Sequence, residues 1–202
     1  MARPSDTSLT RKRRSSLPIS SLGGRPMRRD TGAIPHGEPL AFFLTWTTYG
    51  TWLPGDERSW VDKPGHSRLA DADLERAARS RMTEPCVTLD DEQRQIVERT
   101  IADHCRVRGW HLHAVNCRTN HIHAVITAHA RRPDDVLDQF KAWCTRRLKD
   151  RQRTASPEGF AIRSNWWTQR GSKRWLNDES SLDAAIQYVR EAQDRVGADT
   201  QA

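Results

Sequence analysis

The sequence is poor in cysteine and has no long apolar run. Its four cysteines lie far apart and form no Cys-x-x-Cys pair, so they indicate neither a disulfide framework nor a structural zinc site. No apolar run approaches the roughly 20 residues that span a bilayer, and the segment after Arg13 and Arg14 is too polar for a signal peptide. These absences predict a cytoplasmic protein with reduced thiols and no membrane partner.

Acidic residues are scarce at the N-terminus. Residues 1–38 hold eight Lys and Arg against three Asp and Glu, so this segment carries most of the net charge of +7. It is rich in Arg, Ser, Pro and Gly and cannot bury enough apolar surface to offset chain entropy. We expect a disordered basic tail over 1–38, in which Arg11–Arg14 is either a solvated stretch or a sequence-independent attraction for phosphates.

From residue 40 onward, the hydrophobic pattern alternates between strand and helix periods. The expected elements are a buried strand at 41–47, a mostly irregular region at 50–85 with a helix near 70–82, a helix at 90–108, strands at 109–115 and 121–126, a helix at 133–153, short strands at 166–169 and 174–176, and a helix after 178. This order predicts an α+β, ferredoxin-like fold: an antiparallel sheet with helices on one face. We place one domain at 39–196 and a flexible C-terminus at 197–202.

Two histidines on the strand at 121–126 are candidate metal ligands. Side chains alternate along a strand, so His121 and His123 point the same way while Ile122 enters the opposite layer. Two neutral imidazoles leave positions open on a divalent ion for water and a substrate phosphate. His111 and His113 have the same spacing on the neighbouring strand, so the pattern alone leaves two candidate pairs.

The tract Arg118–Ile126 resembles the Asn-His-hydrophobic-His strand of the single-tyrosine HUH transposases, which include REP-associated tyrosine transposases and insertion-sequence-200-like transposases. Stretches at 45–50, 166–176 and 186–189 agree with this family in the expected order, so the resemblance covers about Leu40 to Asp194. It favours the pair His121 and His123. It implies an endonuclease and strand transferase of DNA transposition and recombination that acts on single-stranded, hairpin-bearing DNA through a 5′-phosphotyrosine intermediate.

The resemblance also implies a tyrosine nucleophile on the last helix, and only two tyrosines exist, Tyr49 and Tyr188. Tyr188 has the matching position, on the flank of an apolar helical stripe. The family carries a third metal ligand one turn after the tyrosine, where this chain has Ala192. We expect Gln193 to take that role in preference to Glu191. The metal, Mg²⁺ or Mn²⁺, would then be held by His121, His123 and Gln193.

Basic residues on two segments are candidate DNA contacts. On the helix at 133–153 we single out Arg146, Lys149 and Arg153, which share a face, and note Lys141 on the same helix. Arg170, Lys173 and Arg174 interleave with tryptophans 166, 167 and 175. Such mixtures stack unpaired bases while cations follow the phosphates.

Three functions are consistent with the sequence. The first is an active transposase, cytoplasmic and nucleoid-associated. The second is a catalytically inactive, domesticated module that binds single-stranded nucleic acid, which the departure at Ala192 motivates. The third is an unrelated metal hydrolase that uses the His121 and His123 pair with a carboxylate. The resemblance leaves assembly open, because insertion-sequence members are homodimers with shared sites and REP-associated members resemble monomers.

Overall fold

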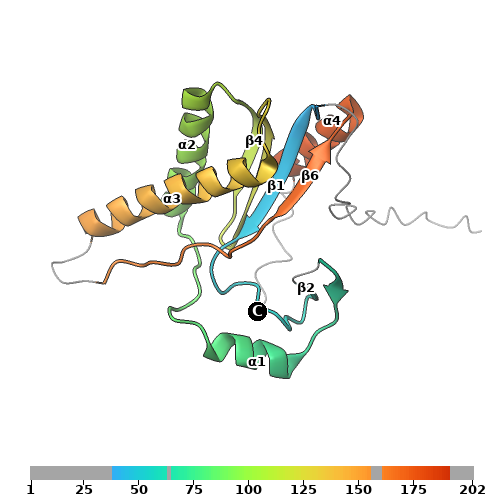
Figure 1. Ribbon diagram of the computed structural model, residues 1–202. Coiled ribbons are helices and arrows are strands. Elements are labelled where there is room, and N and C mark those ends of the chain that lie inside the picture. Colours follow the sequence, from blue (N-terminus) through green and yellow to red (C-terminus); the bar gives the residue numbers. More distant parts are fainter. Residues whose placement is uncertain (1–37, 63–64, 156–160, 192–202) are drawn as a thin grey trace, which may run out of the picture.

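The computed structural model describes residues 38–62, 65–155 and 161–191, and its centre is a four-stranded antiparallel sheet. The strands are β1 (Ala41–Thr47), β4 (His111–Cys117), β5 (His121–Thr127) and β6 (Ser172–Leu176), in the spatial order β4-β5-β1-β6. This is the α+β architecture expected from the sequence (Figure 1). Most of the predicted tail lies outside the described residues, as does the predicted C-terminus.

Two long helices cover one face of the sheet. They are α2 (Asp91–Arg108) and α3 (Pro133–Ala155). Asp90 and Gln93 form a capping box that satisfies the first N–H groups of α2, and Gly109 ends that helix in the left-handed conformation. Burial here contributes roughly 1.5–3 kcal/mol per large apolar side chain. The core between helices and sheet includes Phe42, Leu44, Trp46, Val97, Ile101, Ile122, Ile126, Phe140 and Leu148.

The opposite face of the sheet carries a smaller apolar cluster under the last helix, α4 (Glu179–Glu191). Asp178 begins that helix by accepting hydrogen bonds from the backbone N–H of Ser181 and from the hydroxyls of Ser180 and Ser181. Only Ala185 and Val189 of α4 are buried. The tyrosine-bearing helix is therefore held on the sheet by a narrow apolar strip.

A separate lobe is inserted between β1 and α2. It contains the short strands β2 (Trp60–Val61) and β3 (Ser67–Arg68) and the helix α1 (Ala72–Ser80), which lie below the sheet in Figure 1. Gly55, in the loop after β1, packs against the start of α1. Its φ is +94, and a Cβ there would lie 2.3 Å from the carbonyl oxygen of Asp71. Only glycine fits this turn and this approach.

Sequence periodicity located the elements well but missed several boundaries. The predicted strand at 109–115 runs from His111 to Cys117, and the stretch 166–169 forms one isolated bridge, between Trp167 and Thr48. The ladder between β4 and β5 has an irregularity between Leu112 and Ala114. Within the described ranges, no helix is long and apolar enough to cross a membrane.

Candidate active site

His121 and His123 lie on the sheet face that α4 covers. In the antiparallel register, His123 is opposite Thr45 and His121 is opposite Thr47 of β1. The ring of Phe43, on the same face, stacks against that of His123 with centroids 5.5 Å apart. The alternation predicted from the sequence is therefore present, and both imidazoles point to one side of β5.

His123 is held in a ligand-competent state by burial and by one hydroxyl. Its residue is 8% exposed, and its Nδ1 lies 2.8 Å from Oγ1 of Thr45. Burial first, then the neighbouring His121 and Arg118, lowers the pKa of His123 to about 3. The ring is therefore neutral at physiological pH. When Nδ1 donates to Thr45, the lone pair lies on Nε2, as in a metal-bound histidine oriented by an outer-shell partner.

His121 is oriented by the residue before it. Its Nδ1 lies 2.6 Å from the side-chain oxygen of Asn120, which can only accept, so Nδ1 carries the proton. The His121 and His123 ring centroids are 4.8 Å apart. Two imidazoles on one ion, with metal–nitrogen distances of 2.0–2.1 Å, have centroids roughly 4.5–5.2 Å apart. The two rings thus have the separation that a shared divalent ion requires.

Tyr188 lies directly beside this pair. Its ring centroid is 5.5 Å from that of His123 and 6.0 Å from that of Phe43, both edge-to-face. The residue is 42% exposed, so a substrate can reach it. The backbone of α4 is fixed here because the buried side chain of Asn116 donates to the carbonyl oxygen of Val189 at 2.9 Å. The structure therefore brings the predicted nucleophile and the predicted metal ligands together.

The predicted third ligand, Gln193, and Ala192 lie outside the described residues. The alternative, Glu191, accepts two hydrogen bonds from the side chain of Gln187, at 3.0 and 3.1 Å. Within the part of the chain that the structure describes, no group of three or more His, Cys, Asp and Glu side chains could hold an ion. The two histidines fit a metal centre, whose remaining ligands would come from other groups or from water.

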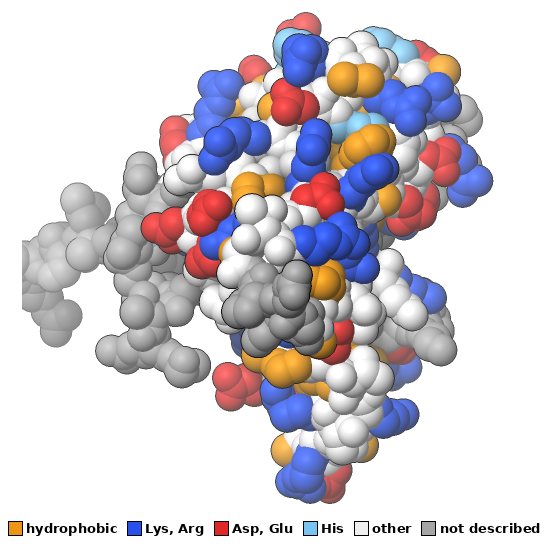
Figure 2. All heavy atoms as spheres, turned by 90° about the vertical axis from the view of Figure 1, so that its left-hand side faces the viewer, with side chains coloured by type: hydrophobic (Ala, Val, Ile, Leu, Met, Phe, Trp, Pro, Cys, Tyr) orange, Lys and Arg blue, Asp and Glu red, His pale blue; other side chains and the backbone are white. Residues whose placement is uncertain are grey.

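The predicted DNA contacts do not share one surface. Arg146, Lys149 and Arg153 lie on α3, which packs on the sheet face opposite the histidines. Lys173 forms an ion pair with Asp134 at the start of the same helix, 2.5 Å apart. Figure 2, which views the left-hand side of Figure 1, shows Lys and Arg interspersed with acidic and apolar side chains. The basic residues therefore form two groups rather than one continuous track.

The tryptophans near β6 are less accessible than their sequence pattern suggests. Trp166 is buried, and Trp167 and Trp175 are partly buried against the core. Trp143 on α3 is 39% exposed, and the guanidinium of Arg146 lies 5.6 Å from its ring centroid. The one predicted cation with an exposed aromatic partner is therefore Arg146, among the described residues.

Lys141 is the clearest departure from the sequence prediction, because it is buried and does not face solvent. Its ammonium donates to the backbone oxygens of Thr168, Gln169 and Arg170, at 2.8, 3.3 and 3.0 Å. Next to this segment, a Cβ on Gly171 would lie 2.6 Å from the backbone of β1. Lys141 is thus a clamp on the segment before β6. The position of Lys141 on the apolar stripe of α3 was the sequence signal that could have predicted its burial.

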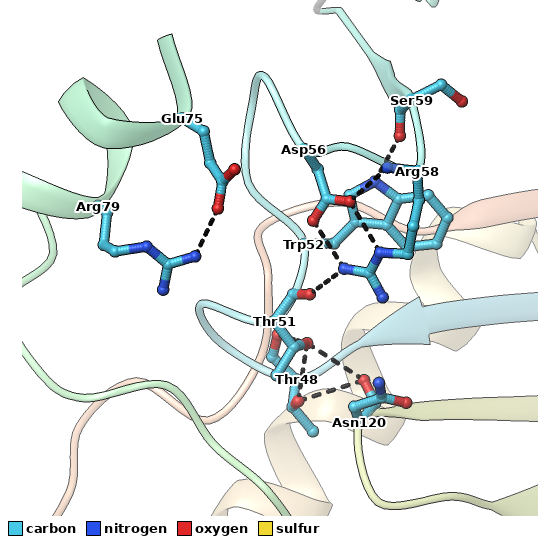
Figure 3. A network of polar contacts seen from close by, with 9 residues as sticks. All are labelled: Thr48, Thr51, Trp52, Asp56, Arg58, Ser59, Glu75, Arg79 and Asn120. Atoms are coloured by element: carbon cyan, nitrogen blue, oxygen red, sulfur yellow. Dashed lines mark hydrogen bonds and ion pairs between the residues drawn. The ribbon is translucent and has the colours of Figure 1, made fainter. Parts of the chain in front are cut away.

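Sequence reasoning also missed a polar network that supports Asn120 (Figure 3). The backbone oxygen of Asn120 accepts from the backbone N–H of Thr48 at 2.9 Å and lies 3.2 and 3.4 Å from the hydroxyls of Thr48 and Thr51. Arg58 donates to the backbone oxygen of Thr51 at 2.6 Å and binds both oxygens of Asp56. The hydrogen bond from Arg58 lowers the pKa of Asp56. The inserted lobe thereby braces the turn that precedes β5.

No family model matches the chain, and no curated protein matches it. Two solved structures are similar. A candidate transposase from Deinococcus radiodurans R1 is 14% identical, with a TM-score of 0.43, over 82% of this chain and 97% of that one. A REP-associated tyrosine transposase bound to a REP hairpin is 11% identical, with a TM-score of 0.46, over 82% of this chain and 73% of that one.

Proposed function

We propose that the chain is a metal-dependent tyrosine transposase that cleaves and rejoins single-stranded, hairpin-bearing DNA. The observation that carries this proposal is the contact between the Tyr188 and His123 rings, 5.5 Å apart, on a face where two oriented imidazoles converge. A buried, neutral His123 suits a divalent ion better than it suits general-base catalysis, because burial lowers its pKa to about 3.

The residues divide the reaction between them. The phenolic oxygen of Tyr188 attacks the phosphorus of a DNA phosphodiester, and the bond from that phosphorus to the 3′-oxygen breaks. Tyr188 is then linked to the 5′-phosphate of the DNA. The phenol loses its proton to solvent, and the released 3′-oxygen takes one up. Rejoining reverses these steps with another 3′-hydroxyl. His121 and His123 would hold Mg²⁺ or Mn²⁺, which supplies charge stabilisation at the phosphate when bound.

DNA binding is assigned to both basic groups. Arg146, Lys149 and Arg153 on α3 would follow phosphates away from the site of cleavage, with Trp143 as a base-stacking surface. Arg174 is paired with Phe43 in the β-ladder, on the face that carries the histidines, and would contact the DNA strand on that face. Lys173 is paired with Leu44 in the same ladder, so its side chain lies on the α3 face, where it would join the first group. Arg170 precedes β6 in the chain.

A covalent-adduct assay tests the proposal. A 5′-tailed hairpin oligonucleotide labelled at its 3′ end is incubated with protein and Mn²⁺, so that a 5′-phosphotyrosine link moves the label with the protein on a denaturing gel. Tyr188→Phe should abolish the adduct and leave hairpin affinity unchanged, because it removes only the attacking oxygen. Tyr49→Phe is the matched control and should form the adduct.

The same assay decides between the candidate functions. Hairpin binding without an adduct in the wild-type protein would favour the inactive binding module. An adduct that persists in Tyr188→Phe would show that the nucleophile is a different residue. Neither binding nor an adduct would leave the unrelated metal hydrolase as the function to examine.

A further inference from the structure

The second histidine pair, on β4, has nearly the same geometry as the pair on β5. The ring centroids of His111 and His113 are 4.4 Å apart with an interplanar angle of 76°, against 4.8 Å and 73° for His121 and His123. The irregularity in the ladder between Leu112 and Ala114 falls at His113. The β5 rings lie within the range of roughly 4.5–5.2 Å for two imidazoles on one ion, and the β4 rings lie just below its lower end.

One hydroxyl fixes the tautomer of His113. Oγ1 of Thr127 donates its only proton to the backbone oxygen of Leu40, and Nε2 of His113 lies 2.8 Å from the same oxygen. Thr127 can therefore only accept from His113, which places the ring proton on Nε2 and the lone pair on Nδ1. An outer-shell acceptor on the second nitrogen is the usual arrangement for a metal-binding histidine.

The surroundings of His113 disfavour its charged form. Burial first, then the neighbouring His111 and Arg190, lowers the pKa of His113. Arg190 donates to the backbone oxygen of His113 at 3.2 Å, so its guanidinium is held close to the ring. The nearby guanidinium disfavours the charged form of the ring and also weakens the attraction for any cation.

We propose that His111 and His113 form a second metal site, specific for transition ions that prefer nitrogen ligands. The ligand set indicates this class of ion, because it has two imidazoles and, among the described residues, no carboxylate with them. Such a set suits Zn²⁺, Ni²⁺ or Cu²⁺ and does not suit Mg²⁺. His111 pairs with Thr127, four residues along β5 from His123, so the two sites are about 14 Å apart and cannot share an ion.

Ni²⁺ binding to the full-length protein, measured by calorimetry and equilibrium dialysis without DNA, tests the site. His111→Ala should reduce the number of bound ions by one. Thr127→Val keeps both imidazoles and should weaken that ion's binding about 10–100-fold, because it removes the tautomer-setting acceptor. Thr127→Ser, which restores the hydroxyl, should recover the wild-type affinity.

The controls distinguish Ni²⁺ binding at His111 and His113 from Ni²⁺ binding at any exposed histidine. His129→Ala removes an exposed histidine elsewhere and should leave the stoichiometry unchanged. The proposal is overturned if His111→Ala binds as many ions as the wild-type protein, or if the only ion bound is the one lost in His121→Ala. Because no DNA or catalysis is involved, these outcomes are independent of whether Tyr188 is a nucleophile.

Discussion

The two histidine pairs share spacing, sheet face and ring separation, but they differ in what surrounds them. The β5 pair lies under Tyr188, His123 is 8% exposed, and hydroxyl and amide side chains orient both imidazoles. The β4 pair has an exposed His111 and one orienting hydroxyl, from Thr127. A His-x-His strand thus supplies two converging imidazoles, while the surrounding fold decides whether they lie beside a tyrosine.

The largest expected effect separates the pairs by activity. His121→Ala or His123→Ala should lower metal-stimulated cleavage by at least about a hundredfold, since losing a ligand costs no less than losing an outer-shell partner. His111→Ala and His113→Ala should change it by no more than about threefold, since neither belongs to the proposed centre. Cleavage rates across a Mn²⁺ titration provide the measurement. A dispensable β5 pair with a required β4 pair would reverse the assignment.

A smaller effect sharpens the comparison through the orienting hydroxyls. Thr45→Val removes the partner of His123 and should raise the Mn²⁺ concentration for half-maximal cleavage about 10–100-fold. It should leave Ni²⁺ affinity at the β4 pair unchanged. Thr127→Val should weaken that Ni²⁺ binding and leave the Mn²⁺ dependence of cleavage unchanged. Measuring both quantities on both variants gives a crossed design. Equal effects of the two variants on both quantities would indicate general loosening of the sheet.

The pH dependence of stability tests the Lys141 clamp, which lies on the sheet face opposite the β5 pair. Burial lowers the pKa of Lys141 to about 8. From pH 8 to about 10.5 the unfolded chain keeps a proton that the folded chain has lost, so this group makes the free energy of unfolding rise with pH. The free energy of unfolding of the wild-type protein should therefore rise by about 3 kcal/mol relative to that of Lys141→Met over that window. Urea denaturation at pH 7.5, 9 and 10.5 would measure it, and a constant difference would contradict the shift.

The smallest expected effect concerns which sheet face the DNA follows. Replacing Arg146, Lys149 and Arg153 by Gln should reduce the salt slope of single-strand binding by about 2, at about 0.7 per phosphate contact. Arg76→Gln, on α1 of the inserted lobe, is the matched control. Fluorescence anisotropy across a salt series would decide. An unchanged salt slope in the α3 variant, together with a reduced slope in Arg174→Gln, would place the DNA strand on the histidine face alone.

The sequence predicted what depends on local periodicity. Strand alternation was enough to place His121 and His123 on one face, and the apolar stripe of α4 placed Tyr188 at its flank. Lys141 was misread because its charge was weighed above its place on the stripe of α3, and its three carbonyl partners come from a segment about 27 residues away. The Arg58 and Asp56 network was out of reach, since it joins a loop to a distant turn.

The narrow attachment of α4 has a consequence for hydrogen exchange. With two buried residues against five on α2, α4 should open locally at a lower free energy than the other helices packed on the sheet. Its amides should exchange in a cooperative unit that includes Tyr188 and excludes β5. Tyr188 and the two histidines would then belong to separately stable parts of one domain. Under the proposed mechanism, a DNA strand attached to Tyr188 would move away from the histidines each time the helix opens.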